Sequence, residues 1–361
     1  MVDPVADPCD LIDRRALDEF LAGVVPAYTS LHISLLAGGA SNLTFLLKTD
    51  RQAYVLRRRP LGRTAPRAHD MKREFTVLNA LREASLPIPR VIAYSEDRRV
   101  VQESFYLMEF VPGAALHAAA AVRSLTPSAG TELSRAVVTT LAGLHDVDPL
   151  AVGLVGLGRP RGFVERRIQS WLRQWRSVEH RDLPQVEELG ERLLRRLPRQ
   201  ARSTLVHGDY RLGNLLVTTD PIVRIAAILD WEMSTLGDPL TDLAHLLVYW
   251  EPTCGRVTHP SQHIAEHPGF LDGGALVEVY AEQTGADVSQ LSFYLAFEHW
   301  RAAIIKDAIH LRRLAEGDLS ADDIALGESV ALHLEEADDV LARLTGTTTA
   351  SLASTNGEPT P

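Results

Sequence analysis

The sequence predicts an α+β protein of two lobes, in which an antiparallel sheet lobe with one helix precedes a mostly helical lobe. Strand-like apolar runs recur between residues 32 and 110, whereas helical apolar periodicity dominates from there to residue 344. Pro112 and Gly113 separate the two patterns. The chain has 361 residues, enough to give both lobes a core.

The first lobe is expected to form a meander of strands around one helix. Asp13 is a potential N-cap for a short helix that precedes the sheet, and Gly23 and Pro26 end that helix. The longer helix has apolar residues at helical spacing, and Pro87 and Pro89 follow it. The expected helices are 13–21 and 70–84, and the expected strands are 32–36, 43–48, 53–57, 91–94 and 105–110.

The second lobe is expected to be helical except for a patch near residues 204–230. A segment rich in Thr, Ser and Pro ends the chain and predicts a disordered tail. We therefore divide the chain into a first lobe (1–108), a hinge (109–115), a second lobe (116–345) and the tail (346–361). Helices are expected at 133–145, 163–175, 184–197, 238–250, 274–284, 288–313 and 322–344.

Composition and charge exclude several classes of partner. Lys and Arg number 37 against 47 Asp and Glu, so the net charge of −10 gives no general attraction to nucleic acid or to an anionic membrane. The only cysteines, Cys9 and Cys254, cannot form a disulfide framework. The longest apolar runs are too short for a membrane span, and the acidic start does not resemble a signal peptide. We expect a cytoplasmic protein with no membrane partner.

The strongest chemical signal lies between residues 205 and 232. The polar loop HGDYRLGN stands between apolar runs and contains Asp209 and Asn214, and a second apolar run then ends at Asp230 in ILDW. Phosphoryl transfer needs a carboxylate beside the acceptor hydroxyl and oxygen ligands that hold Mg²⁺ against nucleotide phosphates. These three side chains supply that set.

The two motifs resemble those of the aminoglycoside phosphotransferase and choline kinase-like family, which shares the protein-kinase fold. The run LRRRP at residues 56–60, at the end of the third strand, resembles the acyl-CoA dehydrogenase-associated branch of this family. The resemblance covers roughly residues 30 to 310. It implies a two-lobed kinase-like fold, a catalytic base at Asp209 and magnesium ligands at Asn214 and Asp230. It also implies that His207 supports the loop, and that Asp242, in a GDPxxDLA-like run, braces the loop by hydrogen bonds.

The same resemblance assigns nucleotide-binding residues in the first lobe. Residues 38–42 occupy the place of the loop that covers the nucleotide, and Gly39, Ser41 and Asn42 are its candidate contacts. Arg57 stands where kinases have the lysine that binds phosphates, and Glu74 stands where its glutamate partner lies. Arginine differs from lysine in offering a planar fork of donors in place of a compact charge.

The remaining assignments concern adenine and the acceptor. Glu109 and Val111 fall at the expected hinge, where backbone groups would bind adenine. Trp300 and Arg301 are candidates for the acceptor pocket, with a packed tryptophan and a surface arginine as the alternative. The cluster of Cys254 and three histidines between 259 and 267 is interpreted as an exposed loop rather than a zinc site, because Pro260 and Pro268 interrupt it.

We therefore expect an enzyme that uses Mg²⁺ and ATP (or GTP) to phosphorylate a hydroxyl of a small molecule. The acceptor could be hydroxyacyl-CoA-like or aminoglycoside-like. One alternative is a catalytically silent nucleotide-binding scaffold, suggested by the arginine in place of lysine, and another is a metal-dependent phosphohydrolase. Two-lobe organisation argues against the latter.

Overall fold

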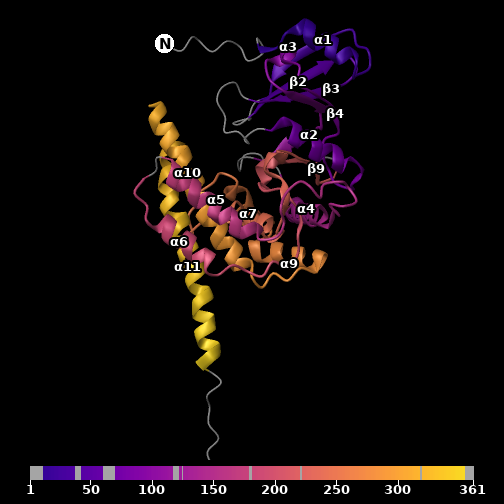
Figure 1. Cartoon of the computed structure of the whole chain (residues 1–361). Coiled ribbons are helices and arrows are strands. Elements are labelled where there is room, and N and C mark those ends of the chain that lie inside the picture. Colours follow the sequence, from indigo (N-terminus) through magenta and orange to yellow (C-terminus); the bar gives the residue numbers. More distant parts are fainter. Residues whose placement is uncertain are drawn as a thin grey trace, which may run out of the picture.

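The computed structural model describes residues 11–36, 42–59, 70–116, 122–123, 125–178, 181–219, 222–317 and 319–353. Figure 1 shows a smaller N-terminal lobe around a sheet and a larger helical lobe below it. The expected α+β, kinase-like arrangement of a sheet lobe followed by a helical lobe is confirmed.

One antiparallel sheet organises the N-terminal lobe. Its five strands run in the order β1-β2-β3-β5-β4, so the strand that carries Arg57 is the central one. Side chains alternate across this sheet. Leu56 and Leu107 pack in the cluster that contains α1, whereas Val55 and Tyr106 pack with α2 in the main core. The strands are β1 (Leu31–Leu35), β2 (Leu43–Thr49), β3 (Ala53–Arg58), β4 (Val91–Ser95) and β5 (Phe105–Glu109).

The described part of the N-terminal lobe contains three α-helices, the two expected near residues 13–21 and 70–84 and a third, short one. They are α1 (Arg14–Ala22), α2 (Met71–Ala80) and α3 (Arg98–Val101). Asp13 and Asp70 cap the first two helices through their side chains, since each accepts a hydrogen bond from a backbone N–H three residues later. The four residues of α3 make a single turn, too short for sequence periodicity to reveal.

The C-terminal lobe packs its helices around two small sheets. The strands on either side of the polar loop belong to these sheets, in which β7 pairs with β10 and β8 lies between β6 and β9. The strands are β6 (Ala114–Ala115), β7 (Thr204–Val206), β8 (Leu215–Thr218), β9 (Arg224–Ile228) and β10 (Thr235–Gly237). The helices are α4 (Pro127–Asp146), α5 (Phe163–Ser177), α6 (Gln185–Leu194), α7 (Leu240–Val248), α8 (Gln262–Ala265), α9 (Gly273–Thr284), α10 (Leu291–Glu316) and α11 (Ala321–Ala353).

Two helices, α4 and α11, extend furthest beyond the expected ranges. Helix α4 begins six residues early because Thr126 caps it and Pro127 occupies its first turn. Helix α11 lies beside α10 and continues to Ala353, so a disordered tail beginning at residue 346 was wrong (Figure 1). Residues 354–361 of that expected tail lie outside the described residues. In the part of the chain that the structure describes, no helix is both long and apolar enough to cross a bilayer.

Gly269 lets the loop after α8 approach the first turn of α4. Its φ is +93°, and an added Cβ would overlap the backbone of Pro127. Gly285 also has a positive φ, of +65°, but an added Cβ there would meet open space. Substituting each glycine in turn therefore separates the free-energy cost of the left-handed backbone from the cost of steric overlap.

We expect Gly269→Ala to lower the free energy of unfolding by about 3 kcal/mol, because strain and overlap add. The matched variant Gly285→Ala should lose only about 1 kcal/mol. Urea denaturation followed by circular dichroism measures both values. Equal losses in the two variants would contradict the close packing at Gly269.

Candidate active site

The polar loop begins directly after β7 and folds back against the segment that leads into β10. Gly208 has a φ of +84°, and a Cβ at this position would lie 2.7 Å from the carbonyl oxygen of Met233. Only glycine combines this backbone conformation with so close an approach. The glycine of HGDYRLGN is therefore required by the turn that presents Asp209.

Asp242 braces this turn from the first turn of α7. Its carboxylate accepts the backbone N–H of His207 at 2.6 Å and that of Gly208 at 2.8 Å. His145, on α4, lies 3.3 Å from the same carboxylate. Burial by itself would raise the pKa of Asp242, but these hydrogen bonds and the nearby histidines lower it. The expected brace is thus in place geometrically.

The ring of His207 links the loop to the end of β9. Its Nε2 lies 2.9 Å from the carbonyl oxygen of Leu229, which can only accept, so Nε2 carries the proton. Its Nδ1 then accepts the backbone N–H of Asp209 at 3.3 Å. His207 therefore supports the loop, as expected, and also fixes the backbone of the residue expected to be the base.

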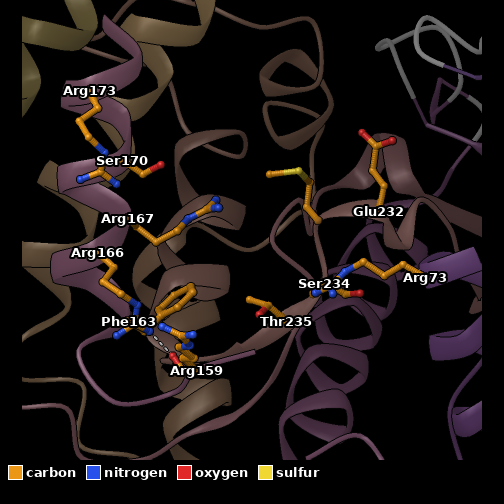
Figure 2. Close-up of a pocket in the computed structure, with 11 residues that line it drawn as sticks. Arg73, Arg159, Phe163, Arg166, Arg167, Ser170, Arg173, Glu232, Ser234 and Thr235 are labelled. Carbon is orange, nitrogen blue, oxygen red and sulfur yellow. Dashed lines mark hydrogen bonds between the residues drawn. The ribbon is translucent and has the colours of Figure 1, made fainter. Parts of the chain in front are cut away.

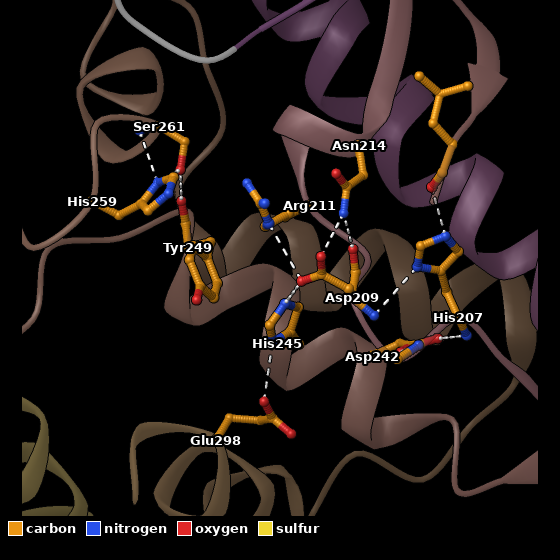
Figure 3. Close-up of polar contacts among 12 residues, drawn as sticks. His207, Asp209, Arg211, Asn214, Asp242, His245, Tyr249, His259, Ser261 and Glu298 are labelled. Carbon is orange, nitrogen blue, oxygen red and sulfur yellow. Dashed lines mark hydrogen bonds and ion pairs between the residues drawn. The ribbon is translucent and has the colours of Figure 1, made fainter. Parts of the chain in front are cut away.

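Asp209 lies at the centre of a set of donors (Figure 3). The side-chain amide of Asn214 donates to one carboxylate oxygen at 2.6 Å, and His245 Nε2 donates to the other at 2.8 Å. Arg211 Nε lies 3.3 Å from that second oxygen. Burial by itself would raise the pKa of Asp209, but His245 and Arg211 hold it well below its usual range. The carboxylate is therefore oriented and ionised.

His245 is a site residue that sequence reasoning missed. It lies on α7 one turn after Asp242 and contacts Asp209 on one side. Its Nδ1 lies 3.0 Å from Glu298 and 2.7 Å from Arg301, both on α10. The spacing of three residues from Asp242 puts both side chains on one helix face, and this was the available signal.

Opposing influences act on the charge of His245. Burial and the charge of Arg301 lower its pKa, but the carboxylates of Asp209 and Glu298 raise it by more, and the net shift is upward. The raised pKa favours a positively charged ring beside Asp209. His245 therefore both orients Asp209 and favours its ionised form.

Asn214 and Asp230 are brought together by the pairing of β8 with β9. Asn214 immediately precedes β8, and its carbonyl oxygen accepts the N–H of Leu229 at 2.8 Å. Asp230 follows and adopts a left-handed backbone, with φ of 66° and ψ of 63°. This conformation is uncommon for a non-glycine residue and is characteristic of functional sites. It turns the chain sharply at the residue expected to bind metal.

The donor set of Asn214 and Asp230 fits a magnesium ion bound together with phosphates. An amide oxygen and a carboxylate are hard oxygen donors, and Mg²⁺ takes one or two such side chains beside phosphate and water. The amide nitrogen of Asn214 donates to Asp209, so its oxygen is the atom left for metal. Among the described residues, no three His, Cys, Asp or Glu side chains form a metal cluster.

Arg57 joins the N-terminal lobe to this site. Strand alternation points it toward α2, where its guanidinium lies 3.4 Å from Glu74 and 2.5 Å from Asp230. Burial by itself would lower the pKa of Arg57, but Glu74, Tyr106 and Asp230 raise it. Burial raises the pKa of Glu74, and the charge of Arg57 opposes this rise. The arginine therefore forms the pair with Glu74 that the lysine of a kinase would form.

The structure describes only some of the other residues expected to contact the nucleotide. Gly39 and Ser41 lie outside the described residues. Asn42 is buried, and its amide lies 3.4 Å from Glu232. Glu109 ends β5, where its carboxylate accepts from Arg90, and Val111 follows in the strand-free segment between the lobes.

The two residues expected in the acceptor pocket, Trp300 and Arg301, have different surroundings in the structure. Trp300 is fully buried and its Nε1 donates to the carbonyl oxygen of Val186, so its placement in an acceptor pocket was wrong. Arg301 is one residue, or about 100° of helix, further on. It lies under the polar loop, 3.4 Å from the carbonyl oxygen of Gly208. His259 is also less exposed than expected, because its ring packs edge-on against Tyr249.

The two lobes, the loop that presents an ionised aspartate and the adjoining oxygen donors form an arrangement typical of kinase-like phosphotransferases. The model of the phosphotransferase enzyme family (APH) matches residues 32–271, and the chain belongs to this family. Among solved structures, a Ralstonia eutropha protein named for the aminoglycoside phosphotransferases is similar, with a TM-score of 0.78 and 29% identity over 92% of this chain and 99% of that chain.

More distant structures share the fold. An aminoglycoside phosphotransferase solved with ADP and hygromycin B has a TM-score of 0.59 at 16% identity, covering 91% of this chain and 97% of that chain. Among curated proteins, acyl-CoA dehydrogenase family member 11 of Homo sapiens is 31% identical over 97% of this chain but only 46% of its own length. Member 10 of Mus musculus is 33% identical over 84% of this chain and 29% of its length. The chain thus spans less than half of these relatives.

Replacing Arg57 by Met should lower the free energy of unfolding by about 3 kcal/mol, because it leaves Glu74 buried without its ion-pair partner. The double variant Arg57→Met/Glu74→Gln should recover most of this loss. Glutamine keeps an oxygen for the backbone N–H of Trp231, which Glu74 accepts at 3.2 Å. Urea denaturation measures the three proteins.

The exposed pair of Arg90 and Glu109 provides the control. Arg90→Met should change the free energy of unfolding by less than about 1 kcal/mol. If the Arg57→Met loss persisted in the double variant, the ion pair with Glu74 would not be its cause.

Proposed function

We propose that this protein is an ATP- or GTP-dependent phosphotransferase that phosphorylates a hydroxyl group of a small molecule. The observation that supports this most directly is the convergence of Asp209 in the loop after β7, Asn214 immediately before β8 and Asp230 after β9. Membership of the phosphotransferase family supports the same reaction. The arrangement positions groups around a phosphoryl transfer and includes no protein nucleophile.

In the proposed reaction, Asp209 accepts the proton of the acceptor hydroxyl. The hydroxyl oxygen forms a bond to the γ-phosphorus while the bond to the β-phosphate oxygen breaks, so ADP (or GDP) leaves with that electron pair. His245 and Asn214 hold the carboxylate in position during this step. Asn214 and Asp230 would hold Mg²⁺, which would neutralise charge on the phosphates.

On the nucleotide side, we propose that Arg57 binds the phosphates and that Glu74 positions it. In the structure the guanidinium lies against Asp230, so a nucleotide and metal would draw these two groups onto phosphate and magnesium, respectively. Asn42, with Gly39 and Ser41, would cover the nucleotide, and the backbone at Glu109 and Val111 would bind adenine or guanine.

Two acceptor classes are consistent with the relatives. The relatives named for the acyl-CoA dehydrogenase family favour a hydroxyacyl-CoA-like acceptor, whereas the solved neighbours include phosphotransferases bound to hygromycin B and spectinomycin. The acceptor would bind beside Asp209, with Arg301 beneath the loop. Either class presents a hydroxyl to the same carboxylate.

We expect Asp209→Asn to reduce phosphoryl transfer by about 10²- to 10⁴-fold, because the amide cannot accept the proton. The measurement is transfer of labelled γ-phosphate from Mg-ATP, and separately Mg-GTP, to hydroxyacyl-CoA thioesters, aminoglycosides and amino alcohols. Asp287→Asn, which changes an exposed carboxylate on a loop, should retain the activity of the natural sequence. Affinity for ADP should be the same in all three proteins.

Binding of ADP without transfer to any acceptor would contradict the proposal and favour the silent scaffold. Phosphate release from phosphoesters without ATP would favour the phosphohydrolase. Transfer that is unaffected by Asp209→Asn would exclude this aspartate as the base.

The link between His245 and Asp209 predicts a shift in pH dependence. His245 lowers the pKa of Asp209, so His245→Ala should raise that pKa, and the acid limb of kcat/KM should move to higher pH. His245→Gln keeps a donor without the charge and should produce a smaller shift. His263→Gln, on an exposed helix, is the control. A lower kcat with an unmoved acid limb in both variants would assign His245 a purely structural role.

A further inference from the structure

A cavity of about 570 Å³ lies beside the site and is lined mainly by arginine. Helix α5 forms one wall, and the segment after Asp230 forms the other (Figure 2). A single carboxylate, that of Glu232, faces five guanidinium groups in the lining. The lining arginines are Arg73, Arg159, Arg166, Arg167 and Arg173.

Helix periodicity explains how one element supplies most of this charge. Arg166, Ser170 and Arg173 follow one another at spacings of four and three residues, so they occupy one face of α5. Arg167 is adjacent to that face and stacks at 6.0 Å from the ring of Phe163. In Figure 2 the Arg167 side chain extends from α5 toward the opposite wall, while Arg166 turns toward Arg159.

Among the described residues, Arg166, Arg167 and Arg173 form no ion pair with a carboxylate, although the charges of Glu298 and Asp242 act on Arg167. Arg166 donates to the backbone carbonyls of Arg159 and Arg161, which are neutral acceptors. Within the described ranges, neither Arg167 nor Arg173 forms a hydrogen bond or ion pair with another residue. The whole chain carries a net charge of −10, so a concentration of positive charge here runs against its overall composition.

Among the described residues, Arg167 shows this lack of an ion-pair partner most clearly. Burial, together with the charge of nearby Arg301, lowers its pKa to about 10. A guanidinium that is drawn out of water beside another guanidinium is unfavourable unless an anion joins it. Its planar fork of donors matches phosphate oxygens in pairs.

The arginine-lined cavity shares lining residues with a second cavity that adjoins the polar loop. Phe163, Arg167, Met233 and Thr235 also line a second, narrow cavity, whose far wall includes Gly208 and Arg301. An anion held by Arg167 would therefore lie close to Gly208, the residue that precedes Asp209 in the polar loop.

We propose that this arginine-lined cavity binds a phosphate-type polyanion on the non-reacting part of the acceptor. The inference rests on the proposed function, because it names the class of molecule that the same site phosphorylates. Such an acceptor carries its hydroxyl and its phosphate groups at separate positions, so that the hydroxyl reaches Asp209 while the arginines hold the phosphates. A polycationic aminoglycoside would be repelled by this lining.

The first experiment measures binding without any turnover. Inorganic pyrophosphate is titrated by calorimetry into the full chain saturated with ADP, at constant free Mg²⁺, so that the nucleotide site is filled. We expect one pyrophosphate to bind, and Arg167→Gln/Arg173→Gln to weaken binding by about tenfold or more. Arg176→Gln is the matched control, because Arg176 lies on the same helix but is exposed and paired with Glu187 at 2.6 Å.

The second experiment compares acceptors that differ only in phosphate groups. A hydroxyacyl thioester of CoA should have a lower KM than the same thioester of pantetheine, which lacks the phosphates. The difference should disappear in Arg167→Gln/Arg173→Gln, with kcat little changed. Thermal melting shows that the variants are folded. Arg173 is exposed and Arg167 forms no ion pair among the described residues, so their replacement should not lower Tm.

The outcomes separate the two proposals. Absence of pyrophosphate binding, or equal weakening by Arg176→Gln, would overturn the anion site, and so would transfer with equal KM for both thioesters. Arginine-dependent pyrophosphate binding without transfer to any acceptor would support the anion site and overturn the proposed function alone.

Discussion

The contact between Arg57 and the two carboxylates of Glu74 and Asp230 is the constraint on which the arrangement of the site depends. It joins the central strand of the N-terminal sheet, the helix packed on that sheet and the turn after β9. Each of these groups is buried or partly buried, so none can easily lose its partner. The relative position of the lobes is therefore tied to the same charges that would bind nucleotide and metal. Arginine suits this role because its several donors can contact two carboxylates at once.

A second network of hydrogen bonds and ion pairs holds the polar loop in place inside the C-terminal lobe. Asp242 holds the backbone of the polar loop, and His245, one helical turn later, holds the carboxylate that the loop presents. Glu298 and Arg301 extend this network to α10. Buried polar groups are stable only when their hydrogen bonds are satisfied, and a connected set of this kind leaves Asp209 few alternative positions. The loop is thus preorganised by groups that do not themselves meet the acceptor.

Charge differs between the polar loop and the wall formed by α5. The carboxylate of Asp209, where proton chemistry would occur, is held by His245, Arg211 and Asn214, while arginines dominate the wall formed by α5. This separation would align a molecule that carries a hydroxyl at one end and negative charge at the other. Net charge alone could not have indicated it, because a total of −10 averages over both regions.

The sequence by itself determined the local chemistry. The five residues from Asp209 to Asn214 form one compact loop, and strand alternation decided that Arg57 and Arg58 face opposite sides of the sheet, because these relationships depend only on neighbours along the chain. Contacts between distant segments were decided by tertiary structure. Helical periodicity in α10, which is buried on most sides, could not show that Trp300 packs in the core while Arg301 turns toward the loop. The partners of His245 and the arginine-lined cavity likewise arise from helices that are far apart in sequence, and only packing brings them together.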